Sequence, residues 1–230
     1  MLDLSLLFKN HFGTRLISDN NIRKFSEIHL QRLIANNSGG MMDQIIAETK
    51  NAYDQYFGSI KEEDQSFAVQ QGLTISVYKV LHEFKRFVSS TEGLIRAQFG
   101  KKSEEYKEFI PYGLKEYWHL NLTKAESAMK RFYNATEKYK AVFGDSLKNL
   151  AQSLLAEFRE ARQNQLNKKG DVSKKKVTTR NNRRTLEIQL MKNLHYVGYL
   201  YPDDENKYKV FFDQSFLRKK SAKKNNNIIS

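Results

Sequence analysis

The chain has 230 residues and no cysteine, so disulfide bonds and thiolate metal sites are excluded. Its 39 lysines and arginines outnumber its 26 acidic residues by 13, and no run of about 18 apolar residues predicts a membrane span. Only two prolines and 11 glycines occur, which favours long uninterrupted helices over many short strands.

Residues 1–17 are apolar and predict an N-terminal arm or a short helix. The segment has no basic region at its start, it carries Asp3, and no small-residue cleavage site follows it, so it does not resemble a secretory signal. We therefore expect a cytoplasmic protein, or a component of an assembly that needs no cleaved signal peptide.

The first half of the chain predicts three helices. Polar residues 18–20 are typical of a helix cap, and the apolar spacing that follows predicts a helix ending at the turn-forming residues 36–40. A second helix is expected from Met41 to Phe57, with Gly58 ending it. The pair Ser59 and Glu62 has the spacing of a capping box, which predicts that a third helix begins there and continues to about residue 99.

The second half predicts further helices separated by glycine, proline and charge. A short helix from Ser103 is followed by a longer one after Pro111, which ends before Gly144. The next helix spans residues 145–161, and the last long one begins near 178–185. The aromatic segments 196–201 and 207–212, on either side of the turn-like residues 202–206, fit either a helix–turn–helix or a β-hairpin. The helical spacing that leads into them favours the helix–turn–helix.

The dipeptide Phe-Gly occurs at 12–13, 57–58, 99–100 and 143–144, at nearly equal intervals. Such spacing is compatible with a helical repeat of this period. The residues between the dipeptides are not similar, however, and glycine commonly ends helices. We therefore prefer a bundle in which glycine follows a packed phenylalanine at helix ends.

The excess positive charge lies in two segments. Residues 162–184 are expected to form a loop between helices and carry nine cations against one acid: Arg162, Lys168, Lys169, Lys174, Lys175, Lys176, Arg180, Arg183 and Arg184. The flexible tail expected at 218–230 adds five more cations, among them Lys219 and Lys220. The rest of the chain is therefore electrically neutral, and these residues are the candidate contacts to a partner or an anion.

No motif predicts catalysis. Glu116 and His119 form one Glu-x-x-His pair, whereas a di-iron bundle needs two such pairs, so we predict no metal site and no cofactor. Nucleophile elbows and glycine-rich phosphate loops are also missing from the sequence. A pocket of convergent polar groups around these two residues would be the observation that favours an enzyme.

These patterns together predict an all-α protein: an elongated antiparallel bundle of about five or six helices over residues 18–217. The basic segment has three interpretations, as a solvated linker, a docking site for a protein, or a weak binder of nucleic acid. Because it lacks aromatic residues, base stacking is not indicated. We expect a non-catalytic structural or adaptor protein, with a protein partner or a homo-oligomer. The alternative is a sequence-independent nucleic-acid binder.

Overall fold

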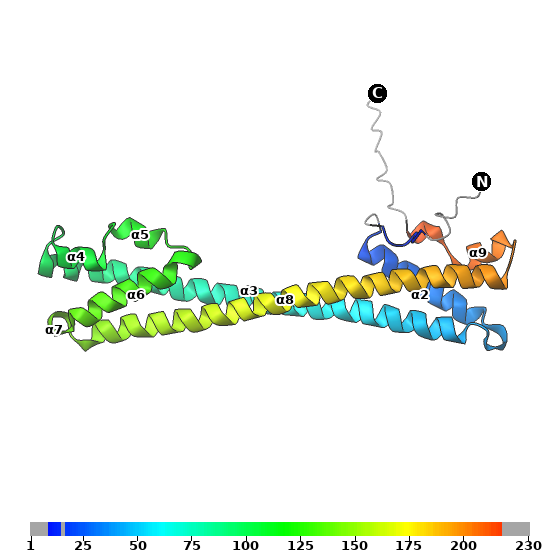
Figure 1. Ribbon diagram of the computed structural model, residues 1–230, viewed down its shortest axis with the longest axis horizontal. Helices are drawn as coiled ribbons and strands as arrows, with labels where there is room; N and C mark the ends of the chain where they lie inside the picture. Colours follow the sequence, from blue (N-terminus) through cyan, green and yellow to red (C-terminus); the bar gives the residue numbers. More distant parts are fainter. Residues whose placement is uncertain (1–8, 15–16, 218–230) are drawn as a thin grey trace, which may run out of the picture. The chain divides into compact units, whose positions relative to one another are not determined.

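The computed structural model describes residues 9–14 and 17–217, and these residues form a helical bundle without strands (Figure 1), which confirms the all-α prediction. The chain divides into two compact units. Unit 1 contains the described residues up to 64 and those from 174 to 217, and unit 2 contains residues 65–173. Two long helices contribute to both units: α3 (Asp43–Phe99) and α8 (Asp145–Leu200).

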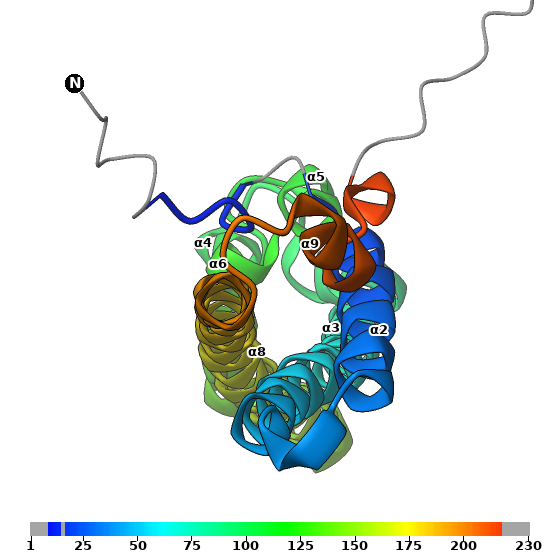
Figure 2. The ribbon, with the colours of Figure 1, turned by 90° about the vertical axis from the view of Figure 1, so that its right-hand side faces the viewer.

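Unit 1 consists of the first part of α3, the last part of α8 and four shorter elements: α2 (Asp19–Ala35), η1 (Ser38–Gly40), α9 (Glu205–Phe211) and η2 (Gln214–Phe216). Within this unit α3 and α8 run antiparallel, because Thr49 contacts Asn193 while Ser59, later in α3, contacts Thr179, earlier in α8. Figure 2 shows α9 beside α2, and residues of these two helices are in contact. The apolar core of unit 1 receives residues from all four α-helices and includes Ile22, Phe25, Leu33, Tyr56, Leu190 and Phe211.

A polar network crosses the core of unit 1 and joins all four of its α-helices. The Nδ1 of buried His29 lies 3.0 Å from the carbonyl oxygen of Phe211, and its Nε2 lies 3.0 Å from the Nδ2 of Asn193. Asn193 also donates to Thr49 Oγ1 at 2.7 Å and accepts from Gln189 at 3.0 Å. The network satisfies side chains that would otherwise be buried without partners.

Unit 2 packs four short helices against the end of α3 and the start of α8: α4 (Glu104–Phe109), α5 (Leu114–Trp118), α6 (Leu122–Lys138) and α7 (Lys140–Phe143). Its core is rich in aromatic rings. Phe132 of α6 meets Phe84, Phe109 and Tyr117 edge to face, with ring centroids 5.6 to 6.0 Å apart. Such edge-to-face contacts add to the stabilisation from apolar burial.

Several predicted helix ends are confirmed. α2 begins after the cap Ser18, whose Oγ accepts from the Asn21 backbone, and ends before the 36–40 turn. α3 and α7 end at Gly100 and Gly144, both with φ of 78°, a backbone conformation that favours glycine. The other two Phe-Gly pairs do not end helices, since Gly58 lies inside α3 and Gly13 lies in a non-helical segment. The dipeptide therefore does not mark a structural repeat.

The predicted break at Gly58 is wrong, because α3 continues through it. A glycine inside a helix costs only about 1 kcal/mol relative to alanine. Buried residues on both sides of it, including Tyr56 and Ser66, hold the helix in place. The hydroxyl of Ser59 caps nothing and instead donates to the Tyr56 carbonyl oxygen within the same helix.

The predicted loop at 162–184 is also wrong, because the whole segment is helical and belongs to α8. One residue in every seven faces inward along this stretch: Gln165, Val172 and Leu186 are buried, and Thr179 is half-buried. Each unit supplies the contacts that hold its own part, such as Gln165 donating to Thr74 Oγ1 in unit 2. The inward residues support the helix, while five of the nine cations are exposed and four, Arg162, Lys168, Lys175 and Arg183, are half-buried.

The chain end is a helix–turn–helix, as predicted, and not a hairpin. α8 ends at Leu200, and Asp204 caps α9 by accepting from the Lys207 backbone at 3.0 Å. Gly198 permits this packing, because a Cβ at that position would overlap the hydroxyl of Tyr208. Of the predicted N-terminal arm, residues 9–14 and 17 are described and non-helical, with Phe12 and Ile17 buried.

Candidate functional site

The predicted basic residues lie on α8, divided between the two units. Arg162, Lys168 and Lys169 belong to unit 2, and the remaining six, from Lys174 to Arg184, belong to unit 1. Lys219 and Lys220 of the predicted tail lie outside the described residues. The nine cations are therefore arranged along one helix. They differ in whether they form ion pairs or hydrogen bonds within the protein.

Among the nine, Lys175, Arg162 and Arg183 make side-chain contacts that support the fold. Lys175 pairs with Glu62 of α3 at 3.1 Å, and Arg162 donates to Gln165 one turn away. Arg183 is the most engaged: it pairs with Asp19, donates to Glu187 Oε1 at 2.8 Å and donates to the Ile17 carbonyl oxygen at 2.6 Å.

The charge of Arg183 is held firmly in place. Burial alone would lower its pKa, but the hydrogen bond to Glu187 and the nearby Tyr56 and Asp19 raise the pKa overall. The same surroundings act on Tyr56. Burial and the hydrogen bond to Asp19 raise the pKa of its hydroxyl above the ordinary value. Arg183 therefore remains a cation that ties the start of α2 to α8.

Five of the nine cations make no ion pair or hydrogen bond within the part of the chain that the structure describes: Lys168, Lys169, Lys174, Arg180 and Arg184. In unit 1, Lys176, Arg180 and Arg184 are exposed and follow one another at intervals of four residues. Side chains at this spacing share one side of a helix. We call these three residues the basic face.

A pocket of about 430 Å³ adjoins the basic face. Arg180, Arg183 and Arg184 line it together with Glu187 and residues of the N-terminal segment, including Gly13 and Ile17. Glu187 is occupied by Arg183, so it does not neutralise the other two guanidinium groups. The pocket therefore offers two unpaired arginines, one turn apart, beside a hollow.

Unit 2 contains a second candidate site along α6. One pocket, of about 490 Å³, is lined by Glu116, Tyr112, Lys124 and Arg131, and a second, of about 570 Å³, is lined by Lys107, Glu108, Lys130 and Lys138. Ser127 and Arg131 line both pockets. We call the two together the α6 groove.

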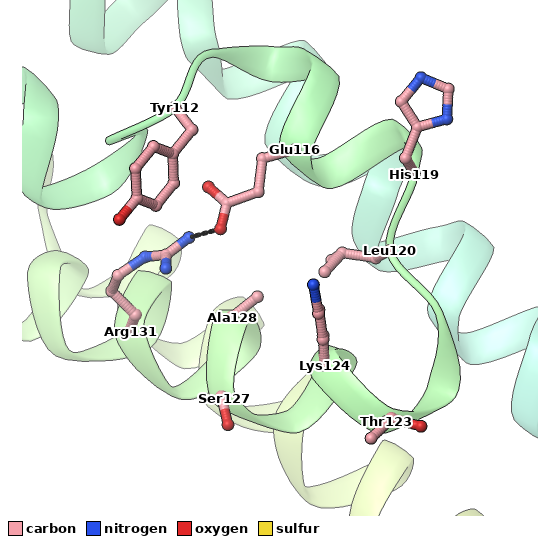
Figure 3. A pocket seen from close by; sticks show the side chains of 9 residues that line it. All are labelled: Tyr112, Glu116, His119, Leu120, Thr123, Lys124, Ser127, Ala128 and Arg131. Atoms are coloured by element: carbon pink, nitrogen blue, oxygen red, sulfur yellow. Dashed lines mark hydrogen bonds and ion pairs between the residues drawn. The ribbon is translucent and has the colours of Figure 1, made fainter.

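Arg131 is fixed at the junction of the two pockets. Its Nη2 donates to Glu116 Oε1 at 2.8 Å (Figure 3). The same Nη2 donates to the Tyr117 hydroxyl at 3.3 Å, and the guanidinium lies over the Tyr117 ring. Burial opposes the charge, yet the hydrogen bonds to Tyr117 and Glu116 raise the pKa of Arg131 overall. Burial raises the pKa of Tyr117 as well, so this hydroxyl stays protonated and donates to the Phe109 carbonyl oxygen.

Glu116 and His119 both line the pocket of about 490 Å³, but their side chains do not point toward each other. Figure 3 shows the Glu116 carboxylate directed at Arg131 and the imidazole of His119 pointing away from it. Among residues 9–14 and 17–217, no three histidine, aspartate or glutamate side chains are grouped as a metal ion would need. Glu116 acts in this structure as the partner of Arg131.

The sequence contained a signal for the α6 groove that charge counting missed. Lys124, Ser127 and Arg131 are spaced three and four residues apart, and Asn134 and Lys138 continue the series. This spacing predicts a polar stripe along one side of a helix. The net charge of the stripe is small beside that of residues 162–184, which dominate the charge pattern of the chain.

Within the described residues no helix has both the length and the apolar character of a membrane span. Comparison of the chain with known protein families, with curated proteins and with solved structures found no match. The function must therefore be argued from the two candidate sites themselves.

Proposed function

We propose that this chain is a non-catalytic adaptor that binds an acidic protein partner through the basic face of α8. The observation that carries the proposal is the pair Arg180 and Arg184. Both guanidinium groups are exposed, unpaired within the described chain, one turn apart and beside a pocket. Arginine binds carboxylates through two parallel hydrogen bonds, so two such groups on one helix suit a partner rich in aspartate and glutamate.

The neighbouring residues support a protein partner over nucleic acid. Val177 and Ile188 are exposed apolar residues of the same part of α8, with 46% and 43% of their surface accessible. Apolar side chains beside arginines are typical of protein interfaces. Single-stranded nucleic acid is usually bound with aromatic side chains that stack on bases, and residues 162–184 contain no aromatic residue.

A catalytic role has less support. Enzymes commonly bring the pKa of an acid or base toward neutrality. In the α6 groove, Arg131 and Tyr117 are both moved the other way, to higher pKa values. These shifts favour groups that keep their protons over groups that transfer them.

The test compares two labelled probes, an oligoglutamate peptide and a short DNA duplex of mixed sequence, over a series of salt concentrations. We expect the full chain to bind the peptide, and the variant Arg180→Gln/Arg184→Gln to bind it about tenfold more weakly, because each lost ion pair contributes up to about 1 kcal/mol. The folded state should be retained, since neither arginine has a partner in the described chain.

The matched control is Lys79→Gln/Arg86→Gln, which removes the same charge from exposed positions of α3 in unit 2. It should bind the peptide as the unaltered chain does. Equal weakening in both variants would mean that overall charge alone attracts the peptide, which contradicts the proposal. Binding of the duplex but not the peptide, with a steep salt dependence lost in the arginine variant, would establish the nucleic-acid alternative instead.

A further inference from the structure

We propose that the α6 groove of unit 2 binds a small phosphorylated molecule, with the phosphate between Lys107 and Lys130 and an aromatic or apolar body against Tyr112. This site is independent of the basic face of α8, because all of its residues belong to unit 2. Each pocket of the groove has a volume in the range of about 300 to 1,000 Å³ that is usual for small-molecule sites.

The pocket beside Lys130 has the charge that a phosphate dianion needs. Four cations line it, Lys107, Lys130, Arg131 and Lys138, against the single carboxylate of Glu108. That carboxylate is occupied, because Lys138 pairs with it at 2.7 Å and the Tyr139 hydroxyl contacts it at 3.2 Å. Lys107 and Lys130 are exposed and have no side-chain partner in the described chain, so their ammonium groups remain for a ligand.

The fixed guanidinium of Arg131 separates this pocket from its neighbour. Glu116 and Tyr117 hold the guanidinium on one side, so little side-chain entropy is lost when a ligand meets it. Ser127, one turn before Arg131, also lines both pockets. Because the two pockets share these lining residues, they adjoin along α6, and we infer that one ligand reaches from one pocket into the other.

The neighbouring pocket suits the remainder of such a ligand. Tyr112 lines it with 79% of its surface exposed, and buried Leu120 and Ala128 add apolar surface. Its net charge is small, because Glu116 neutralises Arg131 and Lys124 is then the remaining cation of the lining (Figure 3). An aromatic ring stacked on Tyr112 would cover apolar surface that is now exposed to water.

The experiment is calorimetric titration of the full chain, at constant ionic strength, with inorganic phosphate, phenyl phosphate and benzyl alcohol. We expect phenyl phosphate to bind more tightly than inorganic phosphate and benzyl alcohol not to bind. Lys107→Gln/Lys130→Gln should weaken both phosphates about tenfold. Tyr112→Ala should weaken phenyl phosphate about fivefold and leave inorganic phosphate unchanged.

Lys79→Gln/Arg86→Gln again serves as the charge-matched control and should leave both affinities unchanged. The proposal is overturned if no phosphate binds in the millimolar range, or if the control weakens binding as much as the lysine variant. It is also overturned if a glycine-flanked phosphoserine peptide binds more tightly than phenyl phosphate and is insensitive to Tyr112→Ala, because the groove would then select a phosphorylated peptide.

Discussion

Asn193 of α8 lies with its Nδ2 3.0 Å from the Nε2 of His29 of α2, in the buried core of unit 1. The Phe211 carbonyl oxygen can only accept, so the Nδ1 of His29, 3.0 Å from it, carries the proton. The Nε2 is therefore an unprotonated acceptor for the Asn193 amide. A second proton on the ring would place two donors against each other without water to separate them.

We predict that unit 1 loses stability as the pH falls below about 6.5. Burial, together with Arg32, lowers the pKa of His29 to about 4 from an ordinary 6.5. Between these values the unfolded chain binds a proton that the folded chain does not. Neutral His29 therefore makes its full contribution to the free energy of unfolding above pH 6.5. That contribution decreases by about 3 kcal/mol as the pH falls toward 4. Urea unfolding at a series of pH values measures it.

The comparison for this prediction is His29→Gln, which cannot titrate. Its free energy of unfolding should be lower at pH 7, because the network loses a partner, but it should fall less steeply between pH 6.5 and 4. Parallel pH profiles for the variant and the unaltered chain would show that carboxylates alone cause the acid sensitivity.

Asn193→Ala should destabilise the protein by about 2 to 3 kcal/mol. The change removes the hydrogen bonds of Asn193 with Thr49, His29 and Gln189, and it leaves the Nε2 of buried His29 without a donor. Asn164→Ala is the matched control, since Asn164 is exposed on the same helix, and its effect should stay within about 0.5 kcal/mol. Equal midpoints in urea for the two variants would contradict the importance of the network.

Neighbouring arginines of α8 should differ in their effect on stability. Arg183→Gln removes contacts to Asp19, Glu187 and the Ile17 carbonyl oxygen, and should cost about 1 to 2 kcal/mol. Arg184→Gln removes no hydrogen bond or ion pair within the described chain and should change the free energy of unfolding by less than about 0.5 kcal/mol. Thermal unfolding of the two variants tests this difference. A larger loss of stability for Arg184→Gln than for Arg183→Gln would contradict the stabilising role of Arg183.

The same substitution, glycine to alanine, should have opposite effects at two positions. Gly170 lies inside α8 with open space where a Cβ atom would lie, so Gly170→Ala should stabilise the protein by about 0.5 to 1 kcal/mol. Gly144 has φ of 78° and ψ of 171°, a conformation nearly restricted to glycine, so Gly144→Ala should cost about 1 to 3 kcal/mol. Chemical denaturation of both variants checks the signs.

The helical class and several helix ends could be predicted because their signals are local. Ser18 caps α2 with its own side chain, and Gly144 adopts a backbone conformation that few other residues tolerate. Each signal is contained within a few residues. The helix–turn–helix near Asp204 is predicted by the helical spacing that leads into it, and the structure adds a local cap at Asp204.

Local sequence signals could not predict that α3 and α8 are each one continuous helix. Gly58 and the charged residues around Lys169 look like interruptions when only neighbours in sequence are considered. Packing across each unit outweighs the local cost, as when Gln165 reaches Thr74, 91 residues away. The inward series Gln165, Val172, Thr179 is largely polar, which weakened the apolar periodicity that would have predicted a helix.

The candidate sites were predictable to different extents. The charge of residues 162–184 identified Arg180 and Arg184, although not that Arg183 between them is bound within the fold. The α6 groove depends on residues from α4, α5 and α6 that meet only after folding, as Glu116 and Arg131 do. The spacing of residues within one helix cannot predict such a contact between two helices.

The order of the two units along the chain has a consequence for synthesis and folding. Unit 2 is one uninterrupted stretch, residues 65–173, inserted between the two halves of unit 1. On the ribosome it can complete its contacts while the second half of unit 1 is still being made. The first half, α2 and the start of α3, can complete its core only after α8 emerges beyond residue 174, because buried Leu186, Leu190 and Val197 of α8 belong to that core. In folded unit 2 the two long helices lie side by side, as the contact between Gln165 and Thr74 shows. The folded insert therefore lowers the entropic cost of joining the two halves of unit 1, compared with a flexible linker of the same length.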